Sequence, residues 1–177
     1  MIGDYYSTLD VEEGGIPAAE RYVNAWSYAN VVDKYVSVYN DGNNDAYVRT
    51  IIAVPAAMDD LIVLNLAMGK TFDMETVDGA MINGVEHNLV VLTYKRGDGI
   101  LEPGKSTGPS LYQVLMFETV DQDDIPAEYA DGFELLVFSQ AVQADGFAEA
   151  LAGQDNIPQK ALNAAFGAIT KDNHPWA

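Results

Sequence analysis

The chain has 177 residues, of which 49% are hydrophobic and 20% charged, and this composition favours one globular domain with a sizeable core. Its 27 acidic residues against 9 basic ones give a formal net charge of −18, so nucleic acid and anionic lipid headgroups are poor partners. The absence of cysteine excludes disulfides, thiolate metal sites and a cysteine nucleophile.

The first 33 residues have a mixed pattern. Residues 2–11 predict a short strand or a loose arm, and the aromatic spacing of residues 18–26 suits a helix or a strand. No apolar run approaches the ~20 residues of a membrane span. The opening letters MIGDYYS contain no visible secretory signal, and they suit either a mature exported chain or a cytosolic start.

A β-hairpin is predicted over residues 34–54. β-Branched and aromatic residues alternate from 34 to 40 and again from 46 to 54, which is the period of a half-buried strand. The five residues between them, DGNND, favour a turn because Gly, Asn and Asp adopt positive φ angles or close Asx turns. Pro55 then ends the second strand, since it has no N–H for the ladder.

The middle of the chain alternates between strand and turn signals. Residues 56–66 predict either a helix start, because two aspartates lie near the beginning, or a buried strand. Residues 70–87 are polar and glycine-rich and predict an irregular loop with short strands. Residues 88–95 and 110–119 have good β composition and predict strands, with two glycine-containing turns between them.

The last third turns from strand to helix. Residues 120–131 predict an acidic loop with a helical turn after Pro126, and residues 133–144 predict a long strand. Residues 147–151 and 158–166 predict short helices, the second of which has a proline in its first turn.

Around six strands with turns between them, and a few short helices mostly near the C-terminus, predict a mainly β fold. We expect one antiparallel β-sandwich domain over residues 1–177. Because side chains alternate along a strand, one face of the predicted strands is expected to fill a single interior. This predicted core consists of Val36, Val38, Val48, Ile52, Leu135 and Val137.

Several runs resemble one family of exported proteins. Residues 33–55, DKYVSVYNDGNNDAYVRTIIAVP, are similar to the central segment of TasA/camelysin-like proteins of Gram-positive bacteria. Later segments of that family resemble Glu102-Pro103-Gly104, the letters LYQV at 111–114 and the letters SQAVQADGF at 139–147. The ending, with AFG at 165–167 and NHPW at 173–176, is similar too. The resemblance covers residues 31–54 and 100–176.

The resemblance implies a secreted jelly-roll-type sandwich, exported through a signal peptidase of the SipW kind, with its signal peptide removed. Members of the family form biofilm-matrix or surface fibres, in which an N-terminal segment of one subunit completes the sheet of the next. Residues 1–12 lie where such an arm is expected, although an arm folded onto its own sheet is the alternative. The more apolar alternate set of this arm is expected to enter a neighbour: Tyr5, Ser7, Leu9 and Val11.

Two functions from different classes follow. The first is a structural protein of cell-surface fibres or biofilm matrix that associates with itself. The second is a monomeric cell-surface binding module for carbohydrate or protein, which displays the loops at residues 67–87 and 120–132. Phe72 and Tyr129 are the aromatic residues of those two loops, and aromatic side chains there would favour a sugar ligand.

Catalysis is not expected, although camelysin gives the family a peptidase label. A zinc peptidase of that kind needs H-E-x-x-H, with two imidazoles one helical turn apart. The two histidines here, His87 and His174, are far apart in sequence. A surface position is expected for His87, within a turn region, and a packing or capping role for His174. We therefore expect no enzyme and no zinc.

Calcium is a weak candidate. Asp41, Asn43 and Asp45 have the spacing of a calcium loop, but Ala46 stands where glycine is required and Ile52 where glutamate is required, so an Asx-rich turn is the better account. The tripeptide Arg96-Gly97-Asp98 is expected to be ordinary turn chemistry. Carboxylates for calcium are also available in the acidic loop, from Asp121, Asp123 and Asp124.

Overall fold

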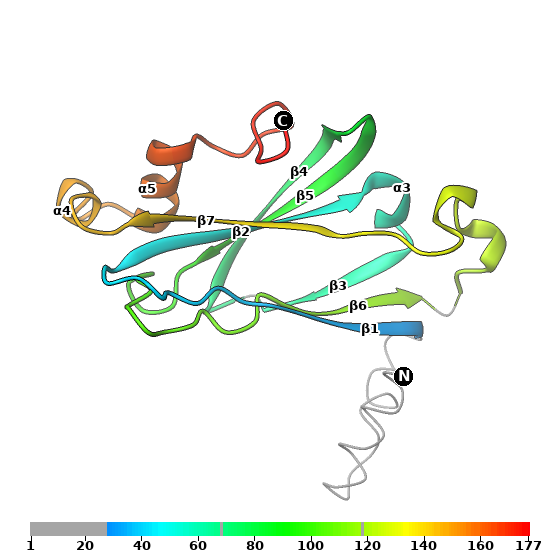
Figure 1. Cartoon of the computed structure of the whole chain (residues 1–177), viewed down its shortest axis with the longest axis horizontal. Coiled ribbons are helices and arrows are strands. Elements are labelled where there is room, and N and C mark those ends of the chain that lie inside the picture. Colours follow the sequence, from blue (N-terminus) through cyan, green and yellow to red (C-terminus); the bar gives the residue numbers. More distant parts are fainter. Residues whose placement is uncertain (1–27, 68, 118) are drawn as a thin grey trace, which may run out of the picture.

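Two antiparallel β-sheets pack face to face in the computed structural model, which describes residues 28–67, 69–117 and 119–177 (Figure 1). This arrangement confirms the predicted mainly β sandwich with few short helices, while the jelly-roll connectivity stays a prediction. The smaller sheet has three strands in the order β1 (Tyr28–Val36), β6 (Leu111–Phe117) and β3 (Ile62–Leu66).

The larger sheet has four strands, and its outer face is covered by the C-terminal part of the chain. The strand order is β4 (Phe72–Ile82), β5 (Val85–Tyr94), β2 (Ala46–Pro55) and β7 (Leu136–Gln143). Helix α5 (Ile157–Phe166) contacts β2 and β7 on this face, and Figure 1 shows it opposite the three-stranded sheet. The remaining helical segments are α3 (Ala56–Asp59), η1 (Gln122–Asp124), η2 (Ala127–Tyr129) and α4 (Phe147–Ala150).

The predicted hairpin over residues 34–54 is wrong, because β1 and β2 belong to different sheets. The residues between them cross the sandwich and bond to residues 101–107 instead of folding back. Asn40 donates its backbone N–H to the carbonyl of Lys105 at 2.9 Å, and its side chain donates to the carbonyl of Leu101 at 2.8 Å. Alternation of side chains predicts a strand but not its partner, since hydrogen bonds to any edge satisfy the same pattern.

Residues 70–87, predicted as an irregular loop, contain the longest strand of the described chain, β4. Strand β4 is polar because it pairs with β5 alone and most of its middle residues are exposed. Asn83 and Gly84, with φ angles of 51° and 82°, join the two strands in a tight turn. Asn-Gly is a strong hairpin signal, since both central residues of that turn need positive φ.

The other elements agree with the sequence predictions. Residues 56–66 hold both of the alternatives, a short helix α3 followed by the strand β3. The predicted strands near 88–95, 110–119 and 133–144 correspond to β5, β6 and β7, and both C-terminal helices form. The part of the chain that the structure describes has no helix that is long and apolar enough to cross a membrane.

The predicted core is largely correct. Val48 and Ile52 are buried in the main interior, and Val36, Val38 and Leu135 are partly buried against it. Val137 does not fit the prediction, because 40% of its surface is exposed. It lies opposite Ile52 in the ladder and so faces the interior, but β7 is an edge strand with no second strand neighbour among the described residues. The prediction was therefore right that Val137 faces the interior and wrong that it is buried.

Candidate docking groove between the two sheets

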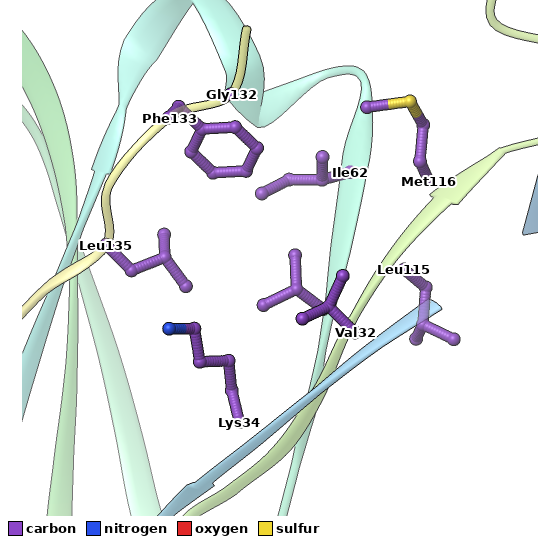
Figure 2. A pocket seen from close by; sticks show the side chains of 9 residues that line it. Val32, Lys34, Ile62, Leu115, Met116, Gly132, Phe133 and Leu135 are labelled. Atoms are coloured by element: carbon purple, nitrogen blue, oxygen red, sulfur yellow. The ribbon is translucent and has the colours of Figure 1, made fainter. Parts of the chain in front are cut away.

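An apolar groove of about 210 Å³ opens between the two sheets at the side where β1 and the approach to β7 lie (Figure 2). The three-stranded sheet forms one wall, and residues 132–135, which lead into β7, form the other. The residues that line it are Val32, Lys34, Ile62, Val114, Leu115, Met116, Gly132, Phe133 and Leu135.

The groove exists because side chains that face the interior are uncovered on the two edge strands. Val32 pairs with Val114 across the ladder and shares its face, yet Val32 is 53% exposed while Val114 is 9% exposed. The same contrast separates Val137, 40% exposed, from its buried ladder partner Ile52. Each of β1 and β7 has a single strand neighbour among the described residues, so no strand covers these positions.

Among the described residues that line the groove, Lys34 carries the only charged side chain. It lies two residues after Val32 on β1 and lines the same groove. Figure 2 shows its ammonium group directed into the groove, towards Leu135. Lys34 is exposed, and no carboxylate of the described residues forms an ion pair with it. No aspartate or glutamate in the described part of the chain lines the groove.

Chemically, this arrangement suits an extended peptide with apolar side chains. A cavity of ~150 Å³ lined by aliphatic and aromatic groups accepts a benzene-sized molecule, so the volume here fits one or two large side chains. An exposed apolar surface beside an unpaired strand edge marks an interaction site, since a guest strand can bond to the edge while its side chains fill the hollow.

The outer face of the four-stranded sheet shows the opposite situation. Arg49, on β2, is 2% exposed, and its guanidinium holds the C-terminal helix against the sheet. It donates to the Gln140 side chain at 2.7 Å, to Asn163 Oδ1 on α5 at 2.8 Å and to the Gly167 carbonyl at 2.9 Å. Burial lowers the pKa of Arg49 from its ordinary value, and the negative charge of Glu75 partly offsets this. Sequence reasoning missed this residue.

The predicted donor residues lie outside the part of the chain that the structure describes. Tyr5, Ser7, Leu9 and Val11 all fall within residues 1–27. Their role therefore stays a prediction. What the structure shows is an apolar groove on the described part of the chain.

The two histidines occupy different settings from each other. His87 was predicted at the surface, but it is 6% exposed on β5, with Nδ1 2.9 Å from the carbonyl of Val85. The surface prediction failed because the turn at 83–84 places this residue within a strand. His174 is also buried and packs against Trp176, with ring centroids 6.3 Å apart, in agreement with the expected packing role.

The acidic candidates are not brought together. Within residues 28–67, 69–117 and 119–177, no group of three or more His, Asp or Glu side chains is arranged to hold a metal ion. Asp121 donates its backbone N–H to Asp124 Oδ2 at 2.8 Å, so one carboxylate of the predicted calcium cluster caps the turn η1. Asp123 is exposed on the same turn. Asp41 and Asn43 are exposed in the crossing segment.

The predicted binding loops are also different from expectation. Residues 67–87 form mostly strand, and Phe72 is 3% exposed, packed edge-on against Tyr94 at 5.8 Å. Tyr129 is half-buried and packs against Phe133 at 6.4 Å, at the rim of the groove. Asp98 of the Arg-Gly-Asp tripeptide accepts the backbone N–H of Ile100 at 3.1 Å, which is ordinary turn chemistry.

Neither aromatic residue therefore provides an exposed platform for a sugar. Comparison of the chain with protein-family models, with curated proteins and with solved structures finds no match, so the likeness to TasA/camelysin-like proteins depends on the sequence runs quoted above.

Proposed function

We propose that the chain is a secreted structural protein of cell-surface fibres or biofilm matrix, which associates when the N-terminal arm of one copy enters the groove of another. The observation that supports this is the apolar groove between the edge strand β1, where Val32 is 53% exposed, and residues 132–135, which lead into β7. A guest strand there would pair with free main-chain groups and cover these side chains together.

The arm has suitable chemistry and reach. Leu9 and Val11 lie two residues apart, so in an extended arm they project to the same side and can fill the groove together. The residues from 12 to 27 join the arm to β1, and a fully extended linker of that length spans up to ~55 Å. This reach is sufficient for the groove of an adjacent copy.

The energetics predict concentration-dependent assembly. Burial of two aliphatic side chains contributes roughly 1.5–3 kcal/mol each, whereas association costs about 4–15 kcal/mol in lost freedom of motion. The surplus must come from main-chain hydrogen bonds along the guest strand and from the covered edge residues. Copies should therefore be monomeric when dilute and assemble only when concentrated.

The test compares the full-length chain with a chain that lacks residues 1–12, by size-exclusion chromatography and negative-stain microscopy over a range of concentrations. We expect the full-length chain to form polymers and the shortened chain to remain folded and monomeric. Leu9→Lys should weaken assembly more than Ser7→Lys, because it places a charge on the apolar groove floor. Both are lysine substitutions on the same face of the arm, so the pair is matched.

A full-length chain that stays monomeric when concentrated, with its arm protected from proteolysis, would contradict the proposal. The arm would then be folded onto its own sheet. The chain would act as a monomeric cell-surface binding module, whose ligand would be sought among carbohydrates and proteins.

A further inference from the structure

A single positive charge marks one end of the apolar groove. Lys34 directs its ammonium group into the space, the remaining lining is apolar or backbone, and no described carboxylate pairs with it. In the open groove, water solvates this charge. A guest that fills the groove removes part of that water, so a guest with a carboxylate at the level of Lys34 is favoured over one without.

The strand register of the three-stranded sheet determines which residues of β1, β6 and β3 lie side by side, and each such row is called a level here. Residue 30 of β1 is in register with Met116 and through it with Ile62, and Val32 is in register with Val114 and Leu64. Lys34 follows along β1 and lines the same groove, with an irregularity of the ladder between Asp33 and Val36. Along the edge of β1, a guest strand therefore lies next to Asn30, then Val32 and then Lys34, and the ladder carries apolar side chains of β6 and β3 behind the first two levels.

The arm carries the matching order. In an extended chain, Leu9, Val11 and Glu13 project to one side, because alternate residues share a face. Val11 and Glu13 correspond to Val32 and Lys34, and Leu9 corresponds to the level of Asn30, behind which the ladder carries Met116 and Ile62. Asp10 and Glu12 project to the opposite side, away from the groove floor.

We propose that Lys34 pairs with Glu13 of the incoming arm and so sets the register and direction of docking. The arm then runs parallel to β1, with Leu9 level with residue 30, Val11 level with Val32 and Glu13 level with Lys34. This inference rests on the proposed function and extends the arm by one residue.

The reverse direction gives a poorer match. An antiparallel arm that keeps Leu9 and Val11 over the two apolar rows places Ser7 beside Lys34 and leaves its ammonium without a carboxylate. Sliding that arm by two residues brings Glu13 to the level of Asn30, away from the ammonium group of Lys34. An unpaired carboxylate there is disfavoured, so the charge excludes wrong registers as well as favouring the right one.

Charge reversal in the full-length chain tests the pair. Glu13→Lys and Lys34→Glu should each raise the concentration needed for assembly by about tenfold, because a partly exposed attraction becomes a repulsion. The double variant, with the two charges exchanged, should return to within about threefold of the wild type. Glu12→Lys is the matched control, since it makes the same change of charge on the opposite side of the arm and should have a smaller effect. Equal effects of Glu12→Lys and Glu13→Lys, or no recovery in the double variant, would overturn the pairing.

Cysteine pairs give a second readout that does not depend on the strength of assembly. The chain has no cysteine, so the full-length variant with Val11→Cys and Val32→Cys holds one defined pair and keeps both Glu13 and Lys34. Adjacent strands lie ~4.8 Å apart, within the Cα separation that a disulfide bridges. We expect rapid oxidation of this pair and little oxidation of the pair Leu9→Cys with Val32→Cys, which reports the antiparallel register.

The position of the disulfide separates the two proposals. A disulfide between chains supports both the pairing and the fibre proposal. A disulfide within one chain, in a protein that stays monomeric, supports the pairing and overturns the fibre proposal. Faster oxidation of the Leu9→Cys pair, or none for the Val11→Cys pair in a chain that still polymerises, overturns the pairing and leaves the fibre proposal standing.

Discussion

Side chains that face the interior between the two sheets are closed to solvent at β2 and open to solvent at the edge strands β1 and β7. At β2, which has strand neighbours on both sides, Ile52 and Val54 are fully buried. At the edge strands β1 and β7, Val32 and Val137 face the same interior but are 53% and 40% exposed. The comparison shows that facing the core and being buried are separate properties, and that a strand with one neighbour leaves its core-facing side chains available to a guest.

The outer face of the four-stranded sheet sharpens this contrast. There the chain supplies its own cover, because Ile169 and Trp176 pack against the cluster of Ile51 and Ala53, and α5 packs against Tyr47. Trp176 packs edge-on against Phe138 of β7 at 6.2 Å on this side. Phe138 on the outer face and Val137 on the inner face are nevertheless both exposed, at 44% and 40%, so the edge position of β7 leaves part of each face open.

The largest expected effect comes from placing a carboxylate in the closed region. Val48→Asp should prevent soluble folding, since an unpaired buried carboxylate costs several kcal/mol against a total stability of ~5–15 kcal/mol. Val137→Asp, on the same inner face but exposed, should stay folded with a loss within ~1 kcal/mol. Soluble yield and urea unfolding measure both. A folded Val48→Asp, or an unfolded Val137→Asp, would show that the two regions are not different.

The next largest effect should come from the cover of the outer face. Arg49→Met keeps the aliphatic stem but leaves three acceptors, on Gln140, Asn163 and Gly167, without their donor. Unsatisfied buried acceptors cost ~1–3 kcal/mol each, and part of this is recovered by water, so we expect a loss of ~2–4 kcal/mol in urea unfolding. Arg96→Met, at an exposed turn, is the matched control and should change stability by ~0.5 kcal/mol or less. Equal losses of stability in the two variants would contradict the role of the Arg49 hydrogen bonds in holding α5 against the sheet.

A smaller difference in stability is expected between two glycine variants in the turn where the chain after β5 meets α5. Gly99 is buried with a φ angle of 80°, and a Cβ there would overlap Pro158 of α5 and lie 3.2 Å from the carbonyl of Tyr94. Gly97 has a φ angle of 68° but nothing within 4 Å of its Cβ position. Both alanine variants lose ~1–2 kcal/mol from the left-handed backbone, and Gly99→Ala should lose ~1–2 kcal/mol more from the overlap. Thermal unfolding of the pair measures this difference, and no difference would mean that α5 packs loosely.

Most of the strands could be predicted from sequence, but their partners could not. Alternation identified the strands around residues 48, 90, 114 and 138, because that pattern is local, whereas the strand predicted at 34–40 overlaps β1 only at its last three residues. The pairing of β1 with β6, whose partners Asp33 and Gln113 are 80 positions apart, is set by tertiary contacts that no local pattern reports. Strand β4 was missed for a different reason: its exposed edge position leaves it polar, and the Asn83-Gly84 turn was the available signal.

The groove could not be predicted at all. It is formed by residues such as Val32 and Leu135, which are about a hundred positions apart and look like ordinary core residues in sequence. Only the strand order shows that both lie at uncovered edges. The role of Arg49 would have been easier to predict, since a single charge inside the apolar run AYVRTIIAVP indicates a buried, hydrogen-bonded guanidinium.

The most direct test of the central claim measures whether the open groove receives the arm. A labelled peptide of residues 1–14 is titrated, by fluorescence anisotropy, into a chain that lacks those residues and into the same chain carrying Val32→Asp. Because Val32 is 53% exposed, the substitution should leave the fold intact while placing a charge on the groove wall. The account predicts saturable binding of one peptide per chain, lost in Val32→Asp. Absence of binding, or equal binding by both chains, would contradict it.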